Sequence, residues 1–288
     1  MNERRFFSAC RFVTGVWNGS APLYAVRHQN PWLSVSLLLA IAGIAENRLT
    51  AEASAERLDP TNAAPEVLTA SIYAKDSSPP RLLFKFKRTV KRSGSTLTAE
   101  RDYTYPDGKL AAREQVVYTD GELTLFQLEE RQTGGSGSAK IHRDPRKPGK
   151  ERIEFEYTRA TGAAPKTGHE ALAPDTVVND MMGTFLAGHW EALAAGERVK
   201  CRYVVVPRRE TVGFTFSRDS ETNWQGQAAL VVKMEATSRI VAALVDPLLF
   251  TIQKAAPHHV LQYVGRTTPK KLSGGKAEDL DAVTVFDW

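Results

Sequence analysis

Apolar and polar residues alternate with a period of two along most of the chain after residue 80, as they do in β-strands that bury one face. The first such stretch alternates Leu82, Phe84, Phe86 and Val90 with Lys85, Lys87, Thr89 and Lys91. Further strands are expected at 97–105, 110–118, 123–129, 152–159, 199–206, 210–216, 228–236, 248–253, 260–265 and 280–288. Two Asp-Gly turns, at 107–108 and 120–121, have the spacing of hairpin turns. The pattern therefore predicts a mainly β fold of about eleven strands, most of them antiparallel.

One long helix is predicted in this β-rich chain, over residues 177–195. The cap-type residues Pro174, Asp175 and Thr176 precede it, and Gly196 closes it. At about 100° per residue, one side of the helix gathers Val178, Met181, Met182, Phe185, Leu186, His189 and Leu193. The opposite side holds Asp180, Thr184, Ala187 and Glu191. We therefore expect a curved antiparallel sheet or half-barrel of about eleven strands, packed around one long amphipathic helix.

Residues 32–45 (WLSVSLLLAIAGIA) form an uncharged apolar run, shorter than the roughly 20 residues that a membrane-spanning helix needs. Arg27 precedes the run and small residues end it, which is the pattern of a cleaved secretory signal. Cleavage after Ala45 would leave a flexible lead-in over 46–65, rich in Ala, Glu, Thr and Pro, and a single β-rich domain over 66–288. The predicted location is periplasmic or secreted, with no stable transmembrane helix after cleavage.

Other interpretations of the leader over 1–45 stay open. Its apolar run could instead be an ordinary buried helix or an uncleaved anchor. The residues Arg4-Arg5-Phe6-Phe7 resemble part of a twin-arginine signal, but the apolar run lies far downstream of them.

The positive charge of the chain comes largely from this leader. The full sequence carries 38 Lys and Arg against 33 Asp and Glu, a net charge of +5. Four of the basic and one of the acidic residues lie in 1–45, so the rest of the chain carries +2. Acidic residues are also interleaved with the basic ones along the predicted strands. A nucleic-acid partner is therefore not expected.

The sequence contains no pattern typical of a catalytic or metal site. No serine has the Gly-x-Ser-x-Gly context, and there is no phosphate-binding loop. The pair His169-Glu170 lacks a second histidine at the spacing of a zinc-protease helix. The neighbours His258 and His259 would point to opposite faces of a strand. We expect no catalytic motif, no metal and no cofactor, and an enzyme stays open only with a site built from loop residues.

Four residues of the predicted helix are the candidate ligand-binding residues: Met182, Phe185, His189 and Trp190. Methionine surfaces adapt to varied apolar ligands, and a histidine among apolar residues needs a hydrogen-bond partner. Two interpretations fit this spacing, and the second is the commoner one in proteins. The residues could line a lipophilic pocket, or they could be core, with His189 satisfied by a backbone carbonyl.

Three stretches resemble exported bacterial proteins of unknown function: 175–196 (DTVVNDMMGTFLAGHWEALAAG), 210–216 (ETVGFTF) and 244–266. The expected architecture is similar to the periplasmic lipoprotein-carrier class, in which a curved antiparallel sheet wraps a helix and holds an acyl chain. This resemblance implies non-enzymatic binding of a hydrophobic ligand, with a lipid or an envelope protein as the partner. It carries over no functional residue, because it concerns architecture alone.

Two other function classes are left open. A structural or interaction protein of the cell envelope would have a filled sheet with no ligand cavity. An outer-membrane barrel is suggested by the final stretch, 280–288, which alternates and ends in an aromatic residue. The sequence does not indicate an oligomeric state.

Overall fold

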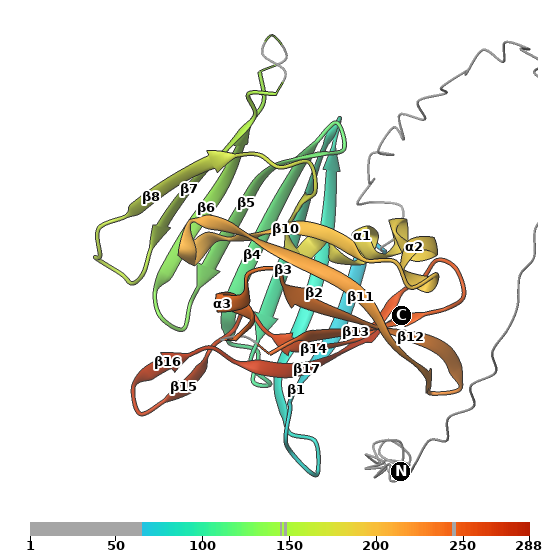
Figure 1. Cartoon of the computed structure of the whole chain (residues 1–288). Helices are drawn as coiled ribbons and strands as arrows, with labels where there is room; N and C mark the ends of the chain where they lie inside the picture. The colour runs from blue at the N-terminus through green and yellow to red at the C-terminus, as the bar shows by residue number, and fades with distance from the viewer. Residues whose placement is uncertain (1–64, 145, 147–148, 244–245) are drawn as a thin grey trace, which may run out of the picture. The chain divides into compact units, whose positions relative to one another are not determined.

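The computed structural model describes residues 65–288 except 145, 147–148 and 244–245. The predicted leader over 1–45, and all but the last residue of the lead-in over 46–65, lie outside the described residues. The described part of the chain is mostly β-strand, which confirms the predicted mainly β fold class (Figure 1).

Seventeen strands run through the described residues. They are β1 (Val67–Ala74), β2 (Leu82–Ser93), β3 (Thr96–Thr104), β4 (Leu110–Thr119), β5 (Glu122–Glu130), β6 (Gly135–His142), β7 (Arg152–Thr158), β8 (Lys166–Ala171), β9 (Thr176–Val177), β10 (Val199–Val205), β11 (Glu210–Trp224), β12 (Gln227–Ala236), β13 (Leu248–Gln253), β14 (Val260–Arg266), β15 (Lys271–Ser273), β16 (Lys276–Glu278) and β17 (Asp281–Asp287). Fifteen of them form one sheet, in the order β8-β7-β6-β5-β4-β3-β2-β1-β17-β14-β13-β12-β11-β10-β9, while β15 pairs with β16. In the large sheet β9 and β10 pair in parallel, and the other neighbours pair antiparallel.

The prediction of about eleven strands is wrong, because several strands of the fifteen-stranded sheet lack an alternating apolar face. Strand β6 begins with a run of Gly and Ser, in which apolar and polar residues do not alternate. The six residues of β8 are polar or small, and all are exposed or half-buried. Such an edge strand is held by its backbone pairing with β7 rather than by an apolar face.

The two ends of the large sheet approach each other, so the sheet curls on itself further than the predicted half-barrel of about eleven strands. Strand β8 lies on one side of this seam, and the connection from β10 to β11 lies on the other. The backbone N–H of Thr211 donates across it to Glu170 Oε1 at 2.7 Å. Nearby, a Cβ added at Gly137 would lie only 2.7 Å from Val206 Cγ1. Glycine at this position of β6 therefore permits the close approach of the two ends.

The helical pieces in the described residues are short: η1 (Asn179–Met181), α1 (Met182–Gly188), α2 (Trp190–Ala194), η2 (Val206–Arg208) and α3 (Arg239–Ala242). The predicted single helix over 177–195 is therefore wrong in length. Val177 pairs with Tyr203 of β10, which takes the start of the segment into the sheet. His189, directly after Gly188, has φ −107° and ψ 18° and separates α1 from α2. Within the described part of the chain, no helix has the length and apolar character needed to cross a membrane.

Candidate functional site

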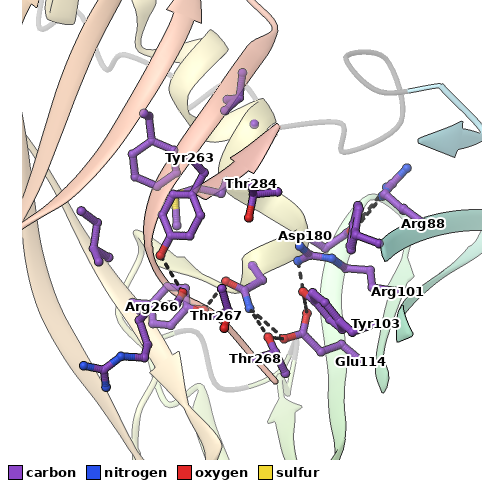
Figure 2. A pocket seen from close by; sticks show the side chains of 18 of the residues that line it. Arg88, Arg101, Tyr103, Glu114, Asp180, Tyr263, Arg266, Thr267, Thr268 and Thr284 are labelled. Atoms are coloured by element: carbon purple, nitrogen blue, oxygen red, sulfur yellow. Dashed lines mark hydrogen bonds and ion pairs between the residues drawn. The ribbon is translucent and has the colours of Figure 1, made fainter. Parts of the chain in front are cut away.

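A cavity of about 440 Å³ lies inside the curled sheet, between strands from both of its halves and the segment of η1 and α1 (Figure 2). Apolar side chains dominate its walls, among them Phe86, Phe126, Met182, Phe214, Phe250 and Phe286. The lining also includes Asp279, just before the start of β17, and Trp288, just after its end. The cavity therefore extends along a strand of seven residues, a length of about 23 Å. Its volume falls in the range of small-molecule sites, about 300–1,000 Å³.

Charged side chains also face the interior, and the alternation of the strands places them there. The inward-facing series are Phe84, Phe86 and Arg88 on β2, Leu97, Ala99 and Arg101 on β3, and Tyr118, Val116 and Glu114 on β4. Residues two apart share one face of a strand, so Arg88, Arg101 and Glu114 point inward with the apolar residues. The sequence analysis missed all three. They can be identified by taking every second residue along each apolar series, because each series then includes a charged residue.

Arg88 and Asp180 form a buried ion pair between β2 and η1 (Figure 2). The pair is bidentate, with Arg88 Nε 2.6 Å from Asp180 Oδ1 and Nη2 3.0 Å from Oδ2. The Tyr118 hydroxyl donates to Asp180 Oδ2 at 3.0 Å. Burial alone would raise the pKa of Asp180, but the hydrogen bonds and charge of Arg88 lower it below the ordinary value. The polar side of the predicted helix thus faces the interior of the protein at Asp180.

Asp180 is expected to make the protein less stable in acid. Its pKa in the folded state lies below the ordinary value of 3.8, so the unfolded chain binds this proton more readily. The stabilisation is complete above the ordinary value and is lost as the pH falls through the lower folded value. We expect the difference in free energy of unfolding between the wild type and Asp180→Asn to shrink as the pH falls from about 6 to about 3. Urea unfolding across this range measures it, and a difference independent of pH would contradict the prediction.

Glu114 is the centre of a second polar group, which joins several parts of the chain (Figure 2). Its Oε1 accepts hydrogen bonds from Asn179 Nδ2 at 2.8 Å and from Thr268 Oγ1 at 2.6 Å. Its Oε2 accepts a longer hydrogen bond, at 3.4 Å, from the Tyr103 hydroxyl. The Tyr203 hydroxyl donates to Asn179 Oδ1. Burial raises the pKa of both tyrosines well above the ordinary value, so both remain protonated donors.

Arg101 projects from β3 into the same polar group, toward the middle of the cavity (Figure 2). Its Nη1 lies 3.2 Å from Glu114 Oε2, and its Cζ lies 5.1 Å from the centre of the Phe86 ring. Burial disfavours the charged guanidinium, yet the negative charges of Glu114 and Asp180 help to raise the pKa of Arg101 above its ordinary value. The cavity therefore contains a permanent positive charge beside an apolar wall.

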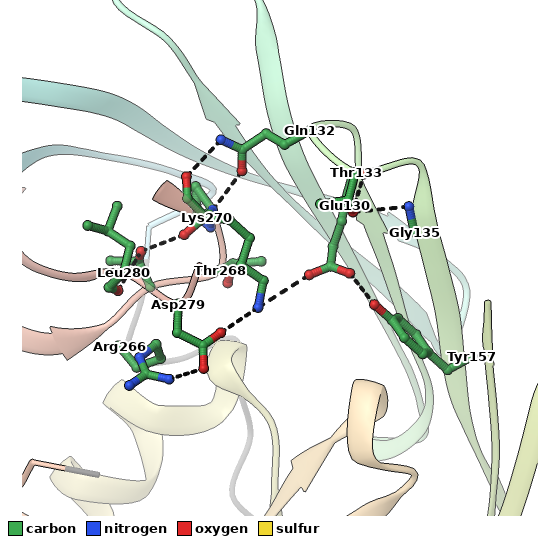
Figure 3. A network of polar contacts seen from close by, with 12 residues as sticks. Glu130, Gln132, Thr133, Gly135, Tyr157, Arg266, Thr268, Lys270, Asp279 and Leu280 are labelled. Carbon is green, nitrogen blue, oxygen red and sulfur yellow. Dashed lines mark hydrogen bonds and ion pairs between the residues drawn. The ribbon is translucent and has the colours of Figure 1, made fainter. Parts of the chain in front are cut away.

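A further polar group borders the cavity near the start of β17 (Figure 3). Glu130 of β5 is buried and accepts a hydrogen bond from the Tyr157 hydroxyl at 2.5 Å. Lys270 Nζ lies 3.5 Å from Glu130 Oε1 and 2.9 Å from Asp279 Oδ1. Gln132 makes hydrogen bonds with both backbone groups of Lys270. Its Nε2 donates to the Lys270 carbonyl oxygen at 2.9 Å, and the Lys270 N–H donates to Gln132 Oε1 at 2.6 Å. These contacts hold the segment between β14 and β17 against β5.

The structure separates the four candidate ligand-binding residues. Met182 lines the cavity. Phe185, His189 and Trp190 are not among the described residues that line it. Phe185 is buried in the core, and His189 Nδ1 lies 2.9 Å from the Phe185 carbonyl oxygen. Trp190 stacks on His258, with 4.2 Å between the ring centres.

The side of α1 that faces the cavity is the one expected to be polar. Gly183, Thr184 and Ala187 are lining residues, while Phe185 and Leu186 are buried among the residues of the core. One side of α1 thus packs on the sheet and the other borders the cavity.

The described residues show no arrangement typical of a metal centre. They contain no group of three or more His, Cys, Asp and Glu side chains that could hold a metal ion. Cys201 is buried, and burial raises the pKa of its thiol to about 12, which makes it a poor nucleophile. What the cavity offers chemically is apolar surface, the guanidinium groups of Arg88 and Arg101 with their acidic partners, and a set of hydroxyl groups.

No protein-family model matches the chain, and no curated protein matches it. Solved bacterial structures are similar to it at low sequence identity. The β-barrel-like protein of the domain of unknown function DUF1849 from Brucella abortus is 8% identical, with 77% of this chain and 94% of that one covered and a TM-score of 0.36. A DUF1329 family protein from Desulfovibrio piger is 9% identical, with 80% and 87% covered and a TM-score of 0.24. A porin-like protein from Bacteroides uniformis is 8% identical, with 77% and 96% covered and a TM-score of 0.21.

Proposed function

We propose that this chain is an exported, non-enzymatic β-rich protein that binds a hydrophobic ligand inside the curled sheet. The observation that carries the proposal is the apolar cavity of about 440 Å³ between the sheet and the segment of η1 and α1. The location rests on the apolar run at 32–45, which has the features of a cleaved signal.

The packing of the protein supports ligand binding over a purely structural role. Protein interiors are packed as densely as organic crystals, and the voids that they leave are few and small. A structural protein of the envelope would gain stability from filling its interior, because each buried methylene contributes about 0.8 kcal/mol. A cavity of this volume with mainly apolar walls is instead what a hydrophobic ligand requires.

Filling the cavity from α1 is expected to block ligand binding. Ala187 is half-buried and lines the cavity, so Ala187→Phe would occupy part of the space available to a ligand. We expect the neutral apolar dye N-phenyl-1-naphthylamine to bind the wild type and to bind this variant about tenfold more weakly. The loss of roughly two buried methylenes is enough for such a change. The rise in dye fluorescence on titration measures it.

The matched control is Ala195→Phe. Ala195 follows α2 and is exposed, so the same side chain is added outside the cavity. The control should bind the dye as the wild type does. Equal weakening in both variants would place the dye on the surface, and no binding to the wild type would overturn the proposed function.

Export is expected to leave a mature chain that begins at Glu46. Mass spectrometry of the protein purified from the envelope of its own cells measures the mature N-terminus and detects any lipid that copurifies. Recovery of the full-length chain from the cytoplasm would contradict the proposed location.

A further inference from the structure

We infer that the hydrophobic ligand carries a single carboxylate, and that the Arg101 guanidinium binds this carboxylate inside the cavity. The inference rests on the proposed function, since it names the chemical class of the ligand for that same cavity. It rests on hydrogen-bond donors of cavity-lining residues that have no partner among the described residues.

The Arg101 guanidinium is the first of these donors. Its Nε and Nη1 are buried, and neither makes a hydrogen bond with another described residue. Nη1 is close enough to Glu114 Oε2 for an ion pair, at 3.2 Å, but it is not aligned for a hydrogen bond. Buried polar groups in folded proteins almost always have a partner. Nε and Nη1 have almost no accessible surface, so a ligand in the cavity would reach the guanidinium at Nη2, which also makes no hydrogen bond with another described residue and keeps accessible surface.

A second donor lies on β17, which is three strands from β3 in the order of the sheet (Figure 2). Thr284 of β17 is buried and lines the cavity, and its hydroxyl makes no hydrogen bond with another described residue. Tyr263, beside it in Figure 2, already donates its hydroxyl to the Arg266 carbonyl at 2.8 Å. Arg101 and Thr284 thus both offer donors to a group bound in the cavity.

The charges around this position favour a carboxylate over a phosphate. Two acidic groups, Glu114 and Asp180, already balance the two guanidinium groups of Arg101 and Arg88. A bound monoanion adds one uncompensated negative charge, whereas a phosphate dianion adds two in a site of low dielectric constant. The planar fork of a guanidinium also matches the two oxygens of a carboxylate.

The remaining wall suits an apolar tail. Strands β13, β14 and β17 contribute Phe250, Val260 and Phe286 to the lining, and Trp288 lies at its end. A head group at Arg101 would direct the rest of the ligand along these side chains. The ligand class is therefore an amphipathic monoanion, a long-chain carboxylic acid.

Competition for the bound dye N-phenyl-1-naphthylamine tests this inference with two ligands that differ only at the head group, dodecanoate and methyl dodecanoate. The measured quantity is the ratio of their dissociation constants, ester over acid, in each protein. The double variant Arg101→Met with Glu114→Gln removes the positive and the negative charge together, so that neither is left buried alone. We expect the ratio to be about tenfold lower in the double variant than in the wild type, because charge-assisted hydrogen bonds to the acid are lost.

A second variant keeps the test decisive if the double variant does not fold. Glu114→Gln alone removes the negative charge that competes with the ligand for Arg101, so the ratio should rise above that of the wild type. Dye binding with the same ratio in all three proteins would overturn the carboxylate while leaving a hydrophobic ligand in place. Failure of the dye and of both competitors to bind the wild type would overturn the proposed function itself.

Discussion

Asp180→Asn is expected to lower the free energy of unfolding by about 3–5 kcal/mol at neutral pH. The substitution removes the charge that pairs with Arg88 and leaves that guanidinium buried without a counter-ion, since its side chain is only 4% exposed. Asparagine also presents a donor where Asp180 now accepts from Tyr118 at 3.0 Å. Removal of one member of a buried pair is costly because the other member keeps its desolvation penalty. Equilibrium unfolding in urea, followed by circular dichroism, measures the loss.

Glu210→Gln is the matched control for this experiment. Its carboxylate pairs with Arg208 at 2.6 Å, the same distance as in the buried pair, but both side chains are about half exposed. Exposed ion pairs contribute about 0–1 kcal/mol, because water and salt screen them. We therefore expect the control to change the free energy of unfolding by less than about 1 kcal/mol. A loss in Asp180→Asn no larger than this would contradict the buried ion pair.

Several strands that alternate cleanly were predictable to within a residue at each end. The stretches expected at 110–118 and 123–129 correspond to β4 (Leu110–Thr119) and β5 (Glu122–Glu130). Both bury one face and expose or half-bury the other. A period of two in the sequence indicates a strand of this kind. Strand β6 was not predictable in this way. Its glycines are required by close contacts, such as that of Gly137 with Val206, and those contacts depend on how the whole sheet curls.

The helix shows how tertiary contacts override a local pattern. A period of 3.6 residues runs through 177–195, yet Val177 pairs with Tyr203 in the sheet and the helix breaks at His189. Helical amphipathicity measures which residues are buried, and it does not report where the segment must bend to follow its surroundings. The four residues chosen from that pattern consequently lie in different environments.

The polar part of the site was half predictable. The period of two alone places Arg101 and Glu114 on an inner, apolar face. Their partners could not be predicted, because Asn179 and Thr268 reach Glu114 from 65 and 154 residues away in sequence. The cavity itself was also out of reach, since it depends on the distance between strands from the two halves of the curled sheet.

Phe185→Ala is expected to lower the free energy of unfolding by about 3–5 kcal/mol. Phe185 is 2% exposed, and its ring centre lies 5.5 Å from that of Phe216 on β11 and 4.3 Å from that of His189. The short helix α1 has little stability of its own, so this packing is what holds it against the sheet. Truncation removes the buried ring and leaves a void that the strands cannot close. Urea unfolding of the protein without added ligand measures the effect.

Leu272→Ala separates this packing from a general effect of losing an apolar side chain. Leu272 lies on the β15–β16 hairpin and is 52% exposed, so its truncation should change the free energy of unfolding by less than about 0.5 kcal/mol. A small loss in Phe185→Ala, comparable to that of the control, would mean that the ring is not part of a packed core. Because Phe185 is not a cavity-lining residue, a large loss in the absence of ligand would assign it to the core that positions α1 beside the cavity.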